Sequence, residues 1–317
     1  MFSIAKSKLA WRTGAILAAA AASGALGIGA ASASTDVPLL GGGITVPGHP
    51  AGAPATLVAS LEGRNEVTGG AQDGQALALF GLQGDKLSYT IRTSGLGIPA
   101  GAAIHAGGPG VDGPVVVPLF TSGNPLVAAS GSVTVTDPAV LDALRSNPGG
   151  FYADLSTAVF PGGAALAQLH LLNHAVAASG VAAVQESVVV GSQIYACTAQ
   201  PDGSFAFTQD NVDAHLTGGI HHTFVQHGPA GPPQWQAPDG SAVTGALVTK
   251  NANGAGNIAE LNLNATQIGA SSGLLAHVVE VLRLNTVGGV APAGSCDPQA
   301  TPTVQVPYHA DYVFING

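Results

Sequence analysis

The clearest indication of the fold in the second half of the chain is the segment Val304-Gln-Val-Pro-Tyr-His-Ala-Asp-Tyr-Val-Phe314. Its even-numbered positions are all apolar or aromatic, and most of its odd-numbered positions are polar. This alternation has the period of a β-strand that turns one face into a core. Because the pattern is so regular, we expect this strand to lie inside a sheet.

The same alternation occurs in the first half of the chain. Lys86-Leu-Ser-Tyr-Thr-Ile-Arg-Thr93 and Ser132-Val-Thr-Val-Thr136 alternate polar and apolar residues, which predicts one face in a core and one in water. Weaker strand candidates, separated by Gly, Pro and Asp turns, are residues 55–61, 75–80, 115–119 and 151–155.

One short helix is predicted among these strands. Asp137 is a suitable N-cap and Pro138 falls at the first helical position. Val140, Leu141 and Leu144 form an apolar stripe before an Asn-Pro-Gly-Gly stretch ends the helix.

The sequence then predicts a second β domain. Residues 172–186 are rich in Ala and lack turn or strand chemistry, so we expect a linker there, and strand patterning resumes at 188–190. Residues 273–284 fit a helical stripe as well as a strand, and their Val content favours the strand. The expected fold is all-β, with two antiparallel sandwich or barrel-like domains in tandem at residues 55–171 and 187–317.

The N-terminus has the pattern of a secretory signal peptide. A basic leader with Lys6, Lys8 and Arg12 precedes an uncharged apolar stretch, and Ala31-Ser-Ala33 is a small-residue cleavage site. We therefore expect residues 1–33 to be removed.

The mature chain would begin with a flexible Gly- and Pro-rich arm at residues 34–54. The apolar stretch before it is too short and too rich in Gly and Ala for a good membrane span, and no comparable run follows. We expect a secreted protein that is free or associated non-covalently with the cell wall.

Charged residues are scarce, at 9% of the chain against roughly 25% in ordinary globular domains. Removal of the signal peptide would leave six basic residues against 18 acidic ones. Because this net charge is negative, nucleic acid is not expected as a partner. The chain is 46% hydrophobic, enough to fill a core, so disorder is not expected.

Two cysteines, Cys197 and Cys296, remain in the mature chain. In an oxidising compartment an even number of cysteines favours a disulfide. Closing a loop of this length stabilises the fold by about 4.7 kcal/mol in the chain-entropy model. A reactive thiol is the alternative.

Several motifs of the first half point to one family. They are Leu61-Glu-Gly-Arg-Asn-Glu-Val67, Asp85-Lys-Leu-Ser-Tyr-Thr90, Ile104-His-Ala-Gly107 with Gly110-Val-Asp-Gly-Pro114, and Phe151-Tyr-Ala-Asp-Leu-Ser-Thr157 with Pro161-Gly-Gly163. On these motifs residues 55–171 resemble the chordin-type domain family, CHRD. The resemblance implies an extracellular all-β module similar in shape to copper/zinc superoxide dismutase. In animals such modules occur in a protein that sequesters growth factors, and bacterial members have no settled role.

This first domain departs from the family pattern in its histidines. The family typically has a His-x-His pair near Ile104 and another His in the strand of Tyr152, but Ala103 and Ser156 replace two of these residues here. His105 alone supplies one of the three or four ligands that zinc or copper needs. We expect His105 to hydrogen-bond a neighbouring turn, and a ligand site is the alternative.

The last third of the chain carries the landmarks of a second family. They are Gln193-Ile-Tyr-Ala-Cys197, His227-Gly-Pro, Trp235, Asp239-Gly-Ser241, Asn285-Thr-Val-Gly-Gly289, Cys296 and Val306-Pro-Tyr-His-Ala-Asp-Tyr-Val-Phe314. On these residues the second domain resembles the secreted family catalogued as domain of unknown function 3455, which has no assigned activity. Some members carry dehydrogenase labels. Here the only G-x-G-x-x-G, Gly108–Gly113, leads into a strand-like stretch and not into a helix, so no cofactor is expected.

Histidines of the second domain are the best candidates for site chemistry. The group comprises His215, His221, His222 and His227, with Asp210, Asp213 and Asp239 nearby in sequence. His221 and His227 could converge across a hairpin at residues 228–233 and hold a divalent metal or position a general base. Their spacing matches no established ligand motif, and the His-Gly-Pro and Asp-Gly-Ser stretches are equally typical of turns. Trp235 is expected to be a core anchor whose indole N–H needs one partner, and Trp235 and Asp239 are alternative ligand-site residues.

The sequence as a whole predicts a secreted, non-catalytic protein that binds an unknown extracellular protein or envelope polymer, with catalytic residues unknown. A metal-dependent enzyme or redox protein that uses the histidines is the alternative. Self-association through the weakly charged surface is a third hypothesis.

Overall fold

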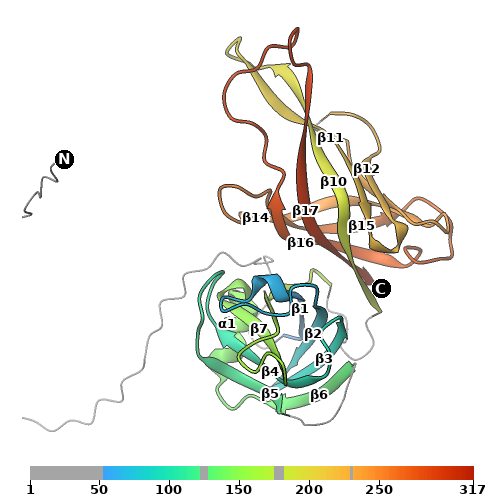
Figure 1. Ribbon diagram of the computed structural model, residues 1–317. Helices are drawn as coiled ribbons and strands as arrows, with labels where there is room; N and C mark the ends of the chain where they lie inside the picture. The colour runs from blue at the N-terminus through green and yellow to red at the C-terminus, as the bar shows by residue number, and fades with distance from the viewer. Residues whose placement is uncertain (1–52, 122–127, 175–181, 229–230) are drawn as a thin grey trace, which may run out of the picture. The chain divides into compact units, whose positions relative to one another are not determined.

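The computed structural model describes residues 53–121, 128–174, 182–228 and 231–317 (Figure 1). The predicted signal peptide and residues 34–52 of the predicted arm lie outside these ranges. Within them the fold is all-β, with a nine-stranded antiparallel sheet followed by a closed antiparallel barrel. The predicted fold class is confirmed. Both sheets belong to one compact unit.

The N-terminal sheet has the strand order β5-β4-β7-β8-β1-β2-β3-β6, and β9 pairs with β1. Its strands are β1 Ala55–Glu62, β2 Gln75–Gln83, β3 Lys86–Ser94, β4 Pro99–Ala106, β5 Val115–Thr121, β6 Ala128–Thr134, β7 Phe151–Thr157, β8 Ala165–Gln168 and β9 His170–Leu171. The helical segments of this domain are η1 Gly63–Asn65, α1 Pro138–Ser146 and η2 Pro148–Gly150.

The local patterns explain these elements. In β3 the side chains of Leu87, Tyr89 and Ile91 enter the core, and the polar residues between them face outward, because successive side chains of a strand alternate between faces. Helix α1 begins as predicted, since the Asp137 carboxylate accepts a hydrogen bond from the Ala139 N–H at 2.9 Å. Strand β6 differs from the prediction, since it begins and ends earlier than residues 132–136.

Eight strands in sequence order form the closed barrel, with β17 beside β10. They are β10 Ala183–Ala199, β11 Phe205–Leu216, β12 His221–Phe224, β13 Pro233–Gln236, β14 Ala242–Asn251, β15 Glu260–Gln267, β16 Val278–Gly288 and β17 Thr303–Asn316, with η3 Thr217–Gly219 before β12. Strand β17 lies between β10 and β16, as its alternating sequence predicts. Its residues Tyr308, Ala310, Tyr312 and Phe314 all enter the apolar core of the barrel.

Two predicted segments are redefined by strand pairing. Strand β10 begins at Ala183, where it pairs with Ile315, so the last residues of the predicted linker at 172–186 are strand. The prediction failed there because β17 supplies the partner from the other end of the domain. Residues 273–284 divide into a turn up to His277 and strand β16 from Val278.

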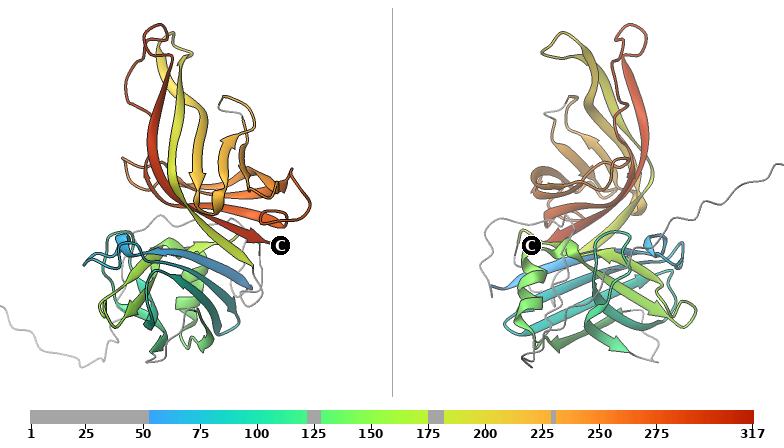
Figure 2. Two further views of the ribbon diagram at one scale, coloured as in Figure 1. Left: turned by 45° about the vertical axis from the view of Figure 1, so that its right-hand side comes forward. Right: turned by 90° about the vertical axis from the view of Figure 1, so that its left-hand side faces the viewer.

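The predicted disulfide is present and joins Cys197 of β10 to Cys296 in the loop before β17, with a Cα–Cα distance of 5.9 Å. The Cys296 N–H also donates to the carbonyl of Phe205 at 3.2 Å. The β10–β11 hairpin (yellow) and the loop before β17 (red) extend together beyond the other barrel strands in both views of Figure 2. The disulfide therefore joins the end of β10 to the loop that extends beside it.

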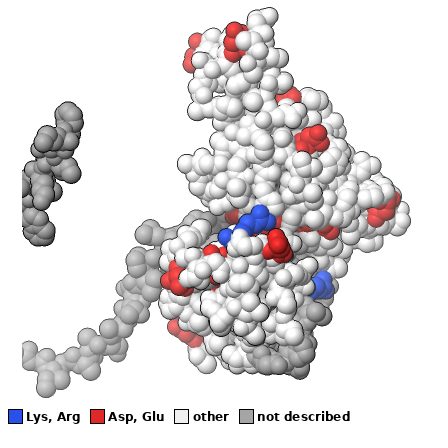
Figure 3. Space-filling view, viewed as in Figure 1, with Lys and Arg blue, Asp and Glu red and all other residues white. Residues whose placement is uncertain are grey.

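The surface carries few charges. Figure 3 shows that most of the face in view has neither basic nor acidic side chains, in keeping with the charged fraction of 9%. Across the ranges that the structure describes, no helix has the length and apolar character needed to cross a membrane.

Candidate functional site

A cavity of about 330 Å³ in the barrel has an aromatic wall and opens to solvent, where Leu247 and Lys250 of its lining are exposed. The rings of His222 and Trp235 stack with their centroids 4.5 Å apart and their planes inclined by 7°. Tyr312 meets Trp235 edge-on at 5.5 Å. The rings meet because His222 and Trp235 are directly paired on β12 and β13, while β17 places Tyr312 in the barrel core.

The ring of His222 is neutral in the folded protein. Burial lowers the pKa of His222 to about 3. Its Nδ1 lies 2.9 Å from the carbonyl oxygen of Gln234, and a carbonyl only accepts hydrogen bonds, so Nδ1 carries the proton. His222 therefore acts here as a flat, uncharged partner of Trp235.

Another part of the cavity wall is polar. It is formed by Gln193, Gln209, Lys250 and Arg283. The Gln209 side-chain amide donates to Gln193 Oε1 at 3.1 Å. Arg283 donates from Nε and Nη2 to one carbonyl oxygen, that of Ala259, at 3.1 and 2.7 Å. These four side chains also line a neighbouring cavity of about 640 Å³, so the two spaces share their polar residues.

Two buried donors of the cavity wall lack partners. Trp235 is 1% exposed and Gln193 is 3% exposed. Within the described residues, neither the indole Nε1 of Trp235 nor the amide Nε2 of Gln193 has a partner at hydrogen-bonding distance. The Gln193 side chain does approach Tyr308 closely enough to lower the pKa of that hydroxyl, which burial raises. An unsatisfied buried donor typically costs about 1–3 kcal/mol. The sequence predicts Trp235 as a core anchor with one partner for its N–H, and the structure supplies the anchor without that partner.

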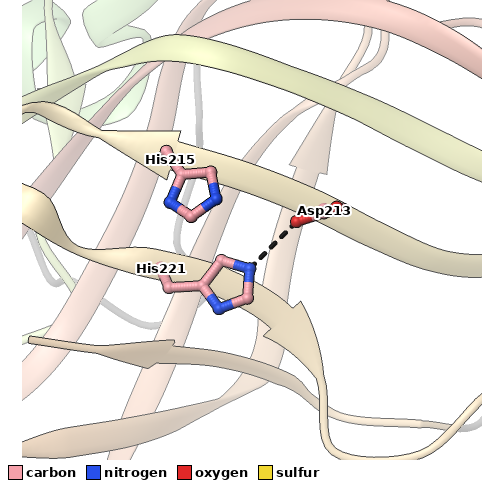
Figure 4. Close-up of side chains that lie close together, drawn as sticks. All are labelled: Asp213, His215 and His221. Carbon is pink, nitrogen blue, oxygen red and sulfur yellow. Dashed lines mark hydrogen bonds and ion pairs between the residues drawn. The ribbon is translucent and has the colours of Figure 1, made fainter.

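Two of the predicted histidines form a surface group with Asp213, drawn in Figure 4. His215 on β11 and His221 on β12 are directly opposite each other, with their rings stacked at 4.7 Å. Asp213 Oδ1 lies 2.9 Å from His221 Nε2. One ligand atom from each of the three residues lies within 4.8 Å of the others, which is a geometry that could hold a metal ion.

The other two predicted histidines lie elsewhere. His222 points into the barrel because it follows His221 in the same strand, and successive side chains alternate between faces. His227 places its Nδ1 2.7 Å from Asp210 Oδ2 and is not in the group of Asp213, His215 and His221. The four histidines that the sequence suggests as one group are therefore found as one pair, His215 and His221, and two separate residues, His222 and His227.

Asp239 and His105 make local contacts. Asp239 Oδ1 accepts from the backbone N–H and the hydroxyl of Ser241, at 2.9 and 2.5 Å, and Oδ2 accepts from the Leu274 N–H at 2.7 Å. These hydrogen bonds lower the pKa of Asp239. In the first domain His105 Nδ1 lies 2.9 Å from the carbonyl of Gly113, which is the predicted contact with a turn.

Sequence reasoning did not single out two carboxylates near His105. Burial raises the pKa of Asp154 to about 6. Burial and the charge of Asp154 raise the pKa of Glu66 to about 8. Neither Asp154 Oδ1 nor Glu66 Oε1 has a partner within the part of the chain that the structure describes. Both residues stand in motifs that resemble the CHRD family, but nothing in their spacing indicates burial.

A further set of potential metal ligands is formed by Glu62, His309 and Asp311. Here hydrogen-bond donors already occupy the Asp311 carboxylate: Ser187 donates to Oδ1 at 2.5 Å, and Asn285 donates to Oδ2 at 2.7 Å. Burial, together with the charge of Glu62, raises the pKa of Asp311 to about 6. We interpret this group as a buried polar network that belongs to the fold.

Comparison with protein families agrees with both resemblances. The family model described as CHRD domain matches residues 57–169. The model described as Protein of unknown function (DUF3455) matches residues 212–316, which include β12 to β17 and most of the cavity wall. No curated protein and no solved structure matches the chain.

Proposed function

We propose that this chain is a secreted, non-catalytic binding protein whose C-terminal barrel holds a small molecule in its cavity. The observation that carries the proposal is the cavity wall, where stacked aromatic rings lie beside two buried donors that lack protein partners. Small-molecule sites are typically concave and largely apolar, with a few placed polar groups, and have volumes of about 300–1,000 Å³.

The chemistry of the wall favours binding over catalysis. General acid–base catalysis needs a titratable group with its pKa near the working pH. His222 is the one histidine among the described lining residues, and its pKa of about 3 makes it a poor base at neutral pH. No carboxylate is found among those same residues.

Secretion is supported by three further observations. The N-terminus has the leader, apolar stretch and cleavage site of a signal peptide. The Cys197–Cys296 disulfide is typical of oxidising compartments. CHRD modules, one of which matches residues 57–169, are extracellular. An extracellular protein or an envelope polymer remains the proposed macromolecular partner of the protein.

The binding proposal is tested by filling the cavity. In Leu261→Trp, bulk is added at a lining residue, and in Val189→Trp the same bulk is added to a side chain that is 68% exposed and not among the lining residues. We expect wild type and Val189→Trp to bind the fluorescent apolar probe N-phenylnaphthylamine, and Leu261→Trp to bind it about tenfold more weakly or worse. Equal binding by all three proteins would refute the proposal. Native mass spectrometry of the secreted protein provides a second readout, because a resident ligand adds a discrete mass.

A second candidate function is metal binding at Asp213, His215 and His221. The specific observation is the directly opposed pair of imidazoles with a carboxylate beside them. Two imidazoles and one carboxylate with open positions suit zinc or copper, which prefer nitrogen and oxygen donors. Because all three side chains lie on the barrel surface, they can rotate to approach a common ion.

Calorimetric titration with Zn²⁺ and Cu²⁺ tests this candidate. We expect His215→Ala and His221→Ala each to weaken metal binding by at least about tenfold. Loss of a residue that only orients a metal ligand already weakens metal affinity by about 10–100-fold, and these two variants each remove a ligand itself. His277→Ala is the matched control, because this histidine is exposed and lies outside the group. If all four proteins bound the metal equally, the ions would be held by unrelated surface groups and the candidate would be wrong.

A further inference from the structure

Positive charge is concentrated in the barrel cavity. From Ala183 to Gly317 the sequence has two basic residues, Lys250 and Arg283, and both line the two adjoining cavities. The same segment has nine acidic residues: Glu186, Asp202, Asp210, Asp213, Asp239, Glu260, Glu280, Asp297 and Asp311. None of these acids is a described lining residue of either cavity. In an acidic protein, the basic side chains of the barrel thus face the same space.

The two cations have no carboxylate partners. Over the described ranges, the ion pairs of the structure include neither Lys250 nor Arg283. Arg283 is half-buried, and the groups that it bonds, the Ala259 carbonyl oxygen and the Tyr312 hydroxyl, are both neutral. The positive charge of Arg283 also acts on the aromatic wall. Burial raises the pKa of Tyr312, and Arg283 lowers it in part. Partly buried cations are normally paired, so this one is available to an anion.

The neutral donors reinforce the same preference. The unpartnered amide of Gln193 and the unpartnered indole N–H of Trp235 are donors, and Lys and Arg side chains are donors without acceptor capacity. A ligand group that accepts several hydrogen bonds and carries negative charge satisfies all of them. The aromatic residues that line the cavity, Trp235, His222 and Tyr312, in turn suit an apolar body.

We propose that the barrel cavity binds a small organic anion, with its carboxylate or sulfonate group at Arg283, Lys250 and Gln193 and its apolar body against Trp235 and His222. This inference rests on the proposed binding function and specifies its ligand class. An uncharged analogue of the same shape binds more weakly, because it leaves the two cations unpaired and the donors unsatisfied.

The test compares two probes that differ by one charged group. Anilinonaphthalene sulfonate and N-phenylnaphthylamine share their aromatic body, and only the first carries an anionic sulfonate. They are titrated into the mature protein, residues 34–317, and into Arg283→Gln and Lys250→Gln. The charge-matched controls are Arg92→Gln and Lys86→Gln, which alter exposed side chains of β3 in the N-terminal sheet.

We expect each cavity variant to weaken binding of the sulfonate probe by about tenfold or more, since a hydrogen bond to a charged group contributes about 1.5–3 kcal/mol. Binding of the uncharged probe should remain within about twofold of wild type, and the two control variants should behave as wild type. Lys250 is exposed, so its replacement tests the charge even if Arg283→Gln alters the fold.

The outcomes separate the two proposals. If both probes bind wild type equally and neither cavity variant discriminates between them, the ligand class is wrong while the binding function stands. If neither probe binds and no mass copurifies with the protein, the binding function itself fails. A third outcome is that Arg283→Gln binds neither probe while Lys250→Gln binds both as wild type does. Arg283 would then be needed for folding, and its role in anion recognition would be overturned.

Discussion

Replacing Cys197 and Cys296 together by serine is expected to lower the free energy of unfolding by about 2–5 kcal/mol. The disulfide closes a loop with a sequence separation of 99 residues, so its removal releases a large part of the unfolded chain from a constraint. The two cysteines also connect β10 to the loop that carries Val290 and Ala291 into the wider cavity. Equilibrium denaturation monitored by circular dichroism measures the change.

Reduction of the wild-type disulfide provides the matching control, because it removes the same constraint without changing a residue. The reduced wild type and the double variant should unfold at the same denaturant concentration, well below the oxidised protein. If the double variant were as stable as the oxidised wild type, the stability of the fold would not depend on the disulfide.

Trp235→Ala is expected to lower the free energy of unfolding by about 3–5 kcal/mol, the usual cost of replacing a buried Trp by Ala. Trp235 is 1% exposed and contacts the rings of His222, Tyr312 and Phe314. Its removal would enlarge an existing cavity in the barrel. Denaturation again measures the loss, with circular dichroism as the signal.

Trp235→Phe separates the ring from its N–H group. Phenylalanine keeps an aromatic surface against His222 and Tyr312 but removes the indole donor, which has no partner among the described residues. Because loss of an unsatisfied buried donor relieves a cost, we expect this variant to lose about 1.5 kcal/mol or less, the usual limit for replacements that nearly conserve volume. A loss as large as that of Trp235→Ala would mean that the indole N–H is bonded in the folded protein.

Ligand binding can be followed through the same residue. The chain has two tryptophans, Trp11 and Trp235, and the first lies in the predicted signal peptide. Once residues 1–33 are removed, intrinsic tryptophan fluorescence reports on the cavity wall alone.

The local elements could be predicted from neighbouring residues. Alternation in residues 86–93 and 304–314 predicted strands β3 and β17, and the Asp137-Pro138 start predicted helix α1. These predictions hold because they depend on near neighbours: the side-chain period of a strand and the cap of a helix are properties of a few adjacent residues. The disulfide was also predictable, from the number of cysteines.

The position of the site, in contrast, depends on how the strands pair in the folded barrel. His221 and His222 are adjacent in sequence, yet one pairs with His215 on the surface and the other stacks on Trp235 in the interior. Lys250 and Arg283 face the same cavity because β14 and β16 each pair with β15 in the closed barrel. Closure and register join strands far apart in the chain, and no pattern of adjacent residues encodes which polar side chains those pairings turn inward.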